Sequence, residues 1–242
     1  MNNFELLSFV DDEQLAEAAA DRWLKEIDQA SRMDRAHCAA LSGGRIARRF
    51  FSAATDLAKA RDLTLSSVHF FWSDERCVPP SDPESNFAIA RELLLGPLQV
   101  AGSQIHRIHG EEPPELAAAA AAADLCRIAP LSGAGQPVLD LIFLGMGEDG
   151  HVASLFPGES QEVMNSEAVY RAVTAPKPPP RRITIGYAAI AAARQVWVLA
   201  SGQGKQDALR QSLGGGGPTP LGRVLKLRNQ TRILTDIPVG ES

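Results

Sequence analysis

Cysteine is scarce in this chain of 242 residues, which has only Cys38, Cys77 and Cys126. The three lie far apart, show no C-x-x-C pair and are odd in number, which argues against a zinc site and against a disulfide framework. We expect buried thiols in a reducing compartment and predict no metal site.

Long apolar runs and an excess of basic residues are also lacking. No apolar run approaches the roughly 20 residues that cross a bilayer. The first residues, MNNFELLSFVDDEQLAEAAADRW, have no basic segment followed by an apolar core. The net charge is -5, whereas nucleic-acid-binding domains carry a basic face. We expect a cytoplasmic protein that binds neither membrane nor nucleic acid.

The chain alternates segments of helical and strand character. Hydrophobic residues make up 45% of it and no low-complexity linker divides it, so we expect a single domain over residues 1–242. The patterns predict helices at 11–30, 46–60, 85–95, 116–128 and 204–213, strands at 37–41, 68–72, 138–144, 169–173, 183–185, 195–200 and 232–235, and a flexible loop at 214–217. This alternation predicts an α/β fold, a mainly parallel sheet with helices on both faces.

The segment LDLIFLGMGEDGHVASLFPG, residues 139–158, contains G-x-G-x-x-G directly after an apolar run. A dinucleotide fingerprint needs a full helix at this point, but Pro157 and Gly158 end any helix after about two turns. Glu148 and Asp149 would also repel a diphosphate. We therefore interpret the glycines as a tight turn that presents His151 at the carboxyl end of a strand, where neighbouring carboxylates fix its tautomer and raise its basicity.

Two further loops follow predicted strands and carry groups suited to phosphate. Ser42, Gly43 and Gly44 precede a helix, so their N–H groups form an anion nest beside Arg45, unless this is an ordinary glycine turn. Arg76 follows Asp74 and Glu75, either of which would orient its planar fork toward phosphate. The alternative there is a surface ion pair of little consequence.

Cations also flank a proline run. Lys177 and Arg182 lie on either side of Pro178-Pro179-Pro180, and a stiff backbone suits them to hold an anion, although a rigid surface connector fits equally well. His69, within a predicted strand, is expected to be a hydrogen-bonded core histidine.

Together these segments resemble the 6-phosphogluconolactonase family. LSGG, DERCVPPSDPESNFAIAR, LGMGEDGHVASLFPG, APKPPPRRIT and GQGKQDAL occur in that family's order and spacing, over nearly the whole chain. The resemblance implies a Rossmann-like α/β domain and hydrolysis of 6-phospho-D-glucono-1,5-lactone to 6-phosphogluconate in the pentose phosphate pathway, without a cofactor. Glucosamine-6-phosphate deaminases share the fold but usually end the histidine motif in an AFNEPG-like sequence, so ASLFPG favours the lactonases.

The resemblance implies that His151 is the general base, oriented by Asp149. The expected substrate-binding residues, in a combination that the sequence leaves open, are Ser42, Gly43, Gly44, Arg45, Asp74, Arg76, Lys177 and Arg182. The family commonly follows SGG with a hydroxyl residue, threonine and proline, whereas this chain has Arg45-Ile46-Ala47; the role of Arg181 stays open. We expect a monomer. The alternatives are a glucosamine-6-phosphate deaminase and a non-catalytic sugar-phosphate sensor.

Overall fold

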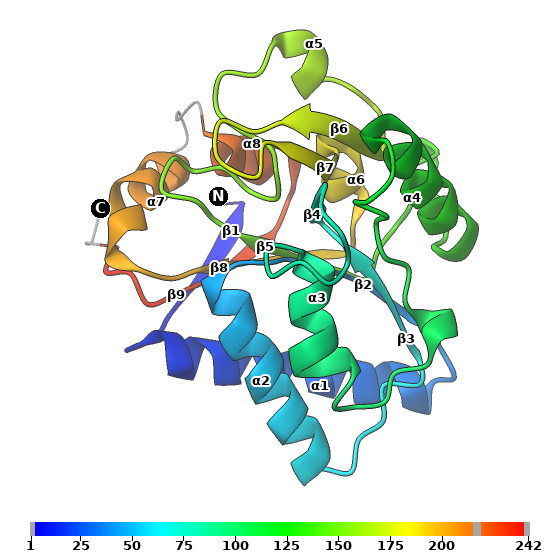
Figure 1. Cartoon of the computed structure of the whole chain (residues 1–242). Coiled ribbons are helices and arrows are strands. Elements are labelled where there is room, and N and C mark those ends of the chain that lie inside the picture. Colours follow the sequence, from blue (N-terminus) through cyan, green and yellow to red (C-terminus); the bar gives the residue numbers. More distant parts are fainter. Residues whose placement is uncertain (1–2, 215–218, 240–242) are drawn as a thin grey trace.

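A six-stranded parallel sheet forms the centre of the computed structural model, which describes residues 3–214 and 219–239. Its order is β1-β9-β8-β5-β2-β3 (Figure 1). The strands are β1 (Phe4–Ser8), β9 (Thr231–Thr235), β8 (Gln195–Ala200), β5 (Leu141–Gly145), β2 (His37–Leu41) and β3 (Val68–Trp72). The predicted α/β fold with a mainly parallel sheet is confirmed.

A second, antiparallel sheet lies on one side of the first and was not predicted. It has the order β4-β7-β6, with β4 (Asp74–Arg76), β7 (Arg181–Ile185) and β6 (Tyr170–Thr174). The predicted strands at 169–173 and 183–185 are therefore real but belong to this small sheet. It carries Arg76 and Arg182 opposite each other in register.

Helices cover both faces of the parallel sheet, as predicted. The helices α1 (Asp12–Arg32) and α2 (Arg45–Ala60) lie on one face, with α3 (Asn86–Ala90), which continues into a π-helical turn, η1 (Arg91–Leu95). On the other face, with the small sheet, lie α4 (Pro114–Ile128), α6 (Tyr187–Ala192) and α8 (Pro220–Leu227) (Figure 1). Short elements complete the fold: η2 (Gly102–Gln104), α5 (Gln161–Met164), η3 (Gln203–Lys205) and α7 (Gln206–Leu213). Of the loop expected at 214–217, residues 215–217 lie outside the described residues.

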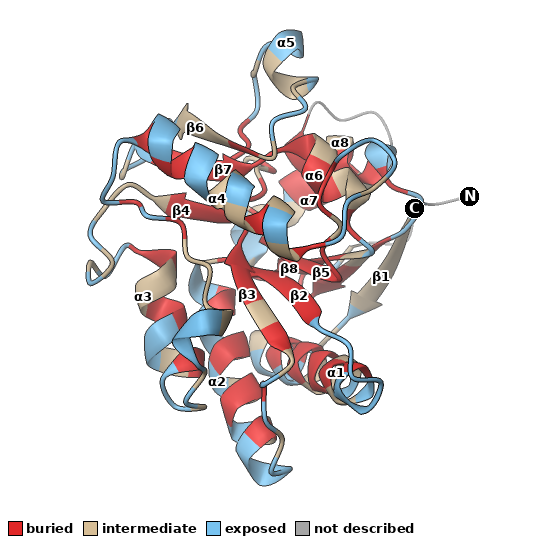
Figure 2. Ribbon diagram, turned by 90° about the vertical axis from the view of Figure 1, so that its right-hand side faces the viewer, coloured by how far each residue is buried: buried red, intermediate tan, exposed pale blue. Residues whose placement is uncertain are grey.

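The core explains why the central strands are apolar along nearly their whole length. Both faces of β2 and β5 are covered, so β2 is buried along its whole length (Figure 2). Trp23 of α1 packs against Phe50 of α2 and against Phe143 of β5, with ring centroids 5.5 and 5.4 Å apart. Each large buried side chain of this kind contributes about 1.5–3 kcal/mol. Such a packed sheet fixes the positions of the loops at its ends.

The histidine and the cysteines outside the site follow the predictions only in part. His69 is hydrogen-bonded, through Nδ1 to Nε2 of His106 at 3.0 Å, but is half-buried rather than in the core. All three cysteines are free; Cys38 is buried, whereas Cys77 and Cys126 are half-buried. Burial raises the pKa of the Cys38 thiol to about 12, which makes it unreactive.

The order in which strands are added to the sheet reverses between β2 and β5, and this switch point places the site. From β2 the chain runs through α2 to β3 on one side, while β8 and β9 add on the other side of β5. Ligands of open parallel sheets bind at such a switch point, outside the carboxyl ends of the strands. The loops after β2 and β5 meet there, with the Gly145 N–H donating to Ser42 Oγ at 3.3 Å.

Candidate active site

A cavity of about 110 Å³ lies at this switch point, open to solvent. Its walls come from the loops after β2 and β5, from the small sheet, from α3 and from the turn after β8. The lining residues are Ser42, Gly43, Gly44, Arg45, Ile46, Asp74, Arg76, Asn86, Gly145, Met146, His151, Ala153, Arg182 and Lys205. The structure thus brings together nearly all of the residues expected from the sequence.

The glycine loop (Ser42–Gly44) leaves the start of α2 open toward the cavity. Gly44 precedes the helix with φ at +93°, a conformation that favours glycine, and it makes no side-chain cap; the first turn contains no acidic residue. The first N–H groups of a helix have no partner within the helix. With the helix dipole behind them, such N–H groups are suited to an anion, and Arg45, the first residue of α2, lines the same cavity.

His151 is held by Asp149 at the turn after β5. The imidazole Nδ1 lies 2.5 Å from Asp149 Oδ1, which also accepts from the His151 backbone N–H at 3.2 Å. Because a carboxylate only accepts, Nδ1 donates its proton and the lone pair of Nε2 stays available. Burial raises the pKa of the Asp149 carboxyl, but hydrogen bonding and charge from His151 outweigh it and hold this pKa below its usual range.

The glycines of the G-x-G-x-x-G segment serve this turn. A Cβ on Gly147 would overlap the His151 ring and come within 2.8 Å of Asp149 Oδ1. Gly150 has φ at +77°, and a Cβ there would lie 2.8 Å from Thr219. The glycines therefore allow the imidazole to fold back over its own loop, as the interpretation of a tight turn presenting His151 requires.

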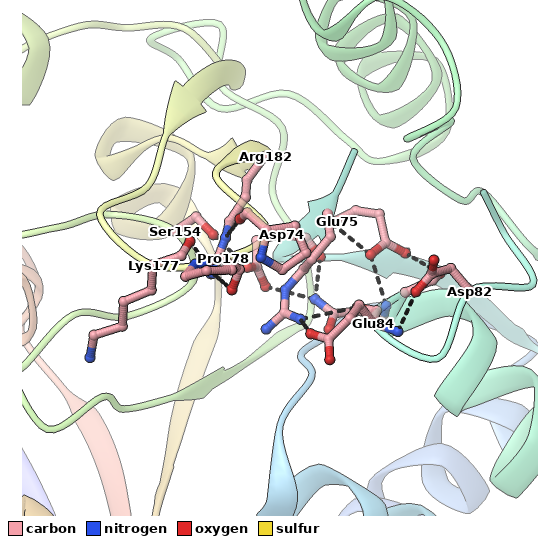
Figure 3. Close-up of polar contacts among 12 residues, drawn as sticks. Asp74, Glu75, Asp82, Glu84, Ser154, Lys177, Pro178 and Arg182 are labelled. Atoms are coloured by element: carbon pink, nitrogen blue, oxygen red, sulfur yellow. Dashed lines mark hydrogen bonds and ion pairs between the residues drawn. The ribbon is translucent and has the colours of Figure 1, made fainter. Parts of the chain in front are cut away.

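Asp74 and Arg76 project from β4 into the cavity, but they do not pair with each other. Asp74 accepts from Ser154 Oγ at 2.7 Å and from Asn86 Nδ2 at 3.1 Å. Arg76 Nη1 donates to the backbone oxygen of Glu84 at 3.0 Å and lies 3.3 Å from its carboxylate (Figure 3). The expectation that Asp74 or Glu75 orients the Arg76 fork is therefore wrong, because Glu84 holds it.

Arg182 is almost fully buried, at 5% exposed, and holds the proline loop. Its Nε donates to Pro179 O at 2.9 Å, and its Nη2 lies 3.3 Å from Lys177 O and 3.2 Å from Pro178 O. The guanidinium also lies over the Phe156 ring, 5.7 Å from the centroid, and that ring is 4.8 Å from the imidazole of His151. Burial, with the charge of Arg76, lowers the pKa of Arg182.

Lys177 does not reach the cavity. Its side chain is exposed and extends away from Arg182, so only its backbone oxygen takes part, as an acceptor for Arg182 (Figure 3). The expectation that its ammonium group lies in the site is not met in this structure. The proline run fixes the path of the backbone, but the direction of a side chain on it depends on the residues packed around it.

Lys205 and Asn86 line the cavity and were missed from the sequence. Lys205 follows β8 in the segment G-Q-G-K, the same strand-then-glycine pattern that identified the glycine loop, so the signal was available. Burial lowers the pKa of Lys205, and so does the neighbouring charge of Arg45, while Glu148 and Asp236 oppose the shift. Asn86 had no such signal, because an asparagine at the start of a helix is ordinary.

Within residues 3–214 and 219–239, no group of three or more histidine, cysteine or acidic side chains is arranged to hold a metal ion. No helix in that part of the chain is long and apolar enough to cross a membrane.

Comparisons with known proteins identify the family. The family model for glucosamine-6-phosphate isomerases/6-phosphogluconolactonase matches residues 10–233. A 6-phosphogluconolactonase of Streptomyces coelicolor is 36% identical over 220 residues, which are 88% of this chain and 84% of the relative. One from Mycobacterium tuberculosis is 40% identical over 165 residues, 66% of this chain and 67% of the relative.

The solved structures agree with these sequence relatives. A 6-phosphogluconolactonase from Trypanosoma brucei superposes with a TM-score of 0.81 at 26% identity, covering 97% of this chain and 96% of that one. The chain belongs to the glucosamine-6-phosphate isomerase/6-phosphogluconolactonase family.

Proposed function

We propose that this chain hydrolyses 6-phospho-D-glucono-1,5-lactone to 6-phospho-D-gluconate. Its sequence relatives carry the name of that enzyme, while the family description also covers glucosamine-6-phosphate isomerases. The observation that carries the proposal is the His151–Asp149 pair, which shares one cavity with the open helix terminus of the glycine loop.

The phosphate is held by the cationic side of this cavity. Ser42, Arg45 and Lys205 line the cavity together with the start of α2, while Arg76 and Arg182 line it from the small sheet. Charge-assisted contacts to phosphate oxygens contribute about 1.5–3 kcal/mol each. Holding the phosphate fixes the lactone carbonyl relative to His151, which removes part of the orientational barrier.

His151 acts on water. Its Nε2 accepts a proton as the water oxygen attacks C1, and Asp149 stabilises the imidazolium that forms. The tetrahedral intermediate then collapses, the bond between C1 and the ring oxygen breaks, and the imidazolium returns the proton to that oxygen. A general base supplies about 10²–10⁴ in rate, which suffices for a δ-lactone that already hydrolyses readily.

The test is a comparison of two substrates. Fresh phosphogluconolactone and glucosamine 6-phosphate are assayed in parallel, and spontaneous lactone hydrolysis is subtracted. Turnover of the lactone alone supports the proposal. Ammonia release from glucosamine 6-phosphate identifies a deaminase, and binding without turnover of either identifies a sensor.

We further propose that the chain works as one domain over residues 1–242, as a cytoplasmic monomer without a nucleic-acid partner. The even composition supports the single domain, and the net charge of -5 supports the absence of a nucleic-acid partner.

A further inference from the structure

Glu75 is a buried carboxylate in β4 that lies outside the cavity. Its neighbours Asp74 and Arg76 both line the cavity, and successive side chains of a strand point to opposite faces, so Glu75 points away from it. It is 3% exposed. A carboxylate buried to this degree requires hydrogen-bond partners.

Four donors converge on that carboxylate. Oε1 accepts from the backbone N–H groups of Arg76 at 2.7 Å and Asn86 at 2.8 Å. Oε2 accepts from the N–H of Phe87 at 2.8 Å and from Ser85 Oγ at 3.0 Å. Three of the four donors belong to the first residues of α3 and its N-cap, so Glu75 fastens the beginning of that helix to β4.

Asn86, the first residue of α3, fills the space between two walls of the cavity. Its Nδ2 donates to Asp74, at 2.9 Å to the backbone oxygen and 3.1 Å to the carboxylate. Its amide also packs so closely on Gly43 that a Cβ there would overlap it. Asn86 is only 1% exposed and has no room to move independently of its neighbours.

We propose that Glu75 is a positioning residue of the proposed lactonase site: it fixes Asn86 between Gly43 and Asp74 and so sets the separation between the glycine loop and β4. The inference rests on the proposed function for its kinetic consequence. Its structural consequence, the position of Gly43, does not depend on the reaction.

The effect of the buried Glu75 charge on the stability of the fold is consistent with a role in positioning. Burial raises the pKa of Glu75 to about 7, although its four hydrogen bonds act in the opposite direction. Arg107, in the segment after η2, and Cys77, directly after β4, lie close enough to Glu75 for its charge to raise their pKa values. At neutral pH an ionised Glu75 therefore weakens the fold, so stability alone does not account for a carboxylate here.

The experiment replaces this charge and compares it with a remote buried carboxylate. Glu75→Gln keeps the size of the side chain but replaces one acceptor oxygen with an N–H₂ group, which meets a backbone N–H donor in either orientation of the amide. Asp140→Asn is the matched control: Asp140 is 7% exposed and accepts from the Cys38 N–H at 2.9 Å, at the amino end of β5, away from the cavity. Steady-state kinetics with the lactone and the amide resonance of Gly43 in the ligand-free protein are measured for both.

We expect Glu75→Gln to lower kcat/KM about 10- to 100-fold and to shift the Gly43 resonance, because small misplacements of a site are costly. Asp140→Asn should leave both unchanged. If Glu75→Gln does not fold, Ser85→Ala is used instead, because it removes one of the four donors to Glu75. This variant should shift the Gly43 amide resonance in the ligand-free protein and lower kcat/KM several-fold.

A double-mutant cycle that combines Glu75→Gln with Asn86→Ala tests whether Glu75 acts on the site through Asn86. If Glu75 acts through Asn86, the two losses in kcat/KM are less than multiplicative. Fully multiplicative losses overturn the proposal, as does a Gly43 resonance that stays in place in Glu75→Gln. If the wild-type protein does not turn over the lactone, the proposed function fails, and the Gly43 resonance alone then decides whether Glu75 positions the loop.

Discussion

Replacing His151 by asparagine separates a hydrolase from a binding protein built on the same loops. The asparagine side chain keeps approximate size and polarity but cannot accept a proton. His151 is partly exposed, with 19% of its side chain accessible, so the fold and the phosphate contacts should survive. We expect kcat to fall about 10²–10⁴-fold, which corresponds to about 2.7–5.5 kcal/mol of transition-state stabilisation.

Asp149→Asn should lose nearly as much, although it leaves the imidazole in place. The carboxylate accepts from Nδ1 at 2.5 Å and so keeps Nε2 unprotonated. An amide that donates to Nδ1 favours the opposite tautomer, in which Nε2 carries the proton and cannot act as a base. Because the two residues act as a unit, the double variant should be little slower than either single variant.

The assay measures lactone turnover at several pH values, with spontaneous hydrolysis measured in parallel because it rises in base. Binding of 6-phosphogluconate, measured by calorimetry, should stay near normal in both variants. His69→Asn is the control, since His69 bonds to His106 outside the cavity and its loss should leave kcat unchanged. Turnover by His151→Asn at the wild-type rate would refute the reasoning, and the base would then have to be sought at Asp74 or Asp149, since Glu75 points away from the cavity.

Three further outcomes follow from the geometry. Lys205→Ala should raise KM about 10- to 100-fold, whereas Lys177→Ala should change it less than twofold; equal effects in steady-state kinetics would contradict the placement of these lysines. Gly43→Ala should lower both turnover and the melting temperature, because its Cβ overlaps Asn86; normal values of both would show that the loop adapts. Since burial raises the pKa of Glu75 from 4.5 to about 7, its contribution to the free energy of unfolding is complete below pH 4.5 and is lost as pH rises through about 7. Urea unfolding at several pH values should show the free energy of unfolding falling between about pH 4.5 and 7, and Glu75→Gln should reduce this pH dependence. An unchanged pH dependence in Glu75→Gln would mean that other groups cause it.

The parallel sheet and its loops were predictable because both depend on local patterns. Buried parallel strands are apolar on both faces, so β2, β3 and β8 stand out in the sequence, and the glycines that follow β2 and β5 mark the turns where ligands bind. The strand β5 begins at Leu141 rather than at residue 138. The residue at which a strand begins depends on pairing with adjacent strands rather than on the residues of the strand itself.

The small sheet was not predictable in the same way. The strand β4 consists of Asp74, Glu75 and Arg76, residues that are not typical of strands, and it exists because it pairs with β7 about a hundred residues later in the chain. Asp74 is satisfied by Ser154 from a distant segment, whereas Arg76 and Glu75 are satisfied by Glu84 and by the start of α3, which the loop after β4 folds back onto the strand. The error about which residue holds Arg76 arose because adjacency in sequence is misleading within a strand: Glu75 points to the opposite face, and Glu84 reaches Arg76 through the loop after β4.

The charge of the cavity shows why net charge predicts so little about the ligand of an enzyme. The whole chain carries -5, yet within its described part four cationic side chains and one carboxylate, Asp74, line the cavity. Arg45 and Lys205 lie close enough for one charge to lower the pKa of the other, and Arg76 acts in the same way on Arg182. Like charges held together in this way repel, and a bound anion relieves that repulsion. A phosphate dianion in this cavity would therefore be attracted by the four cationic side chains that line it. The neutral lactone ring would remain free to face His151.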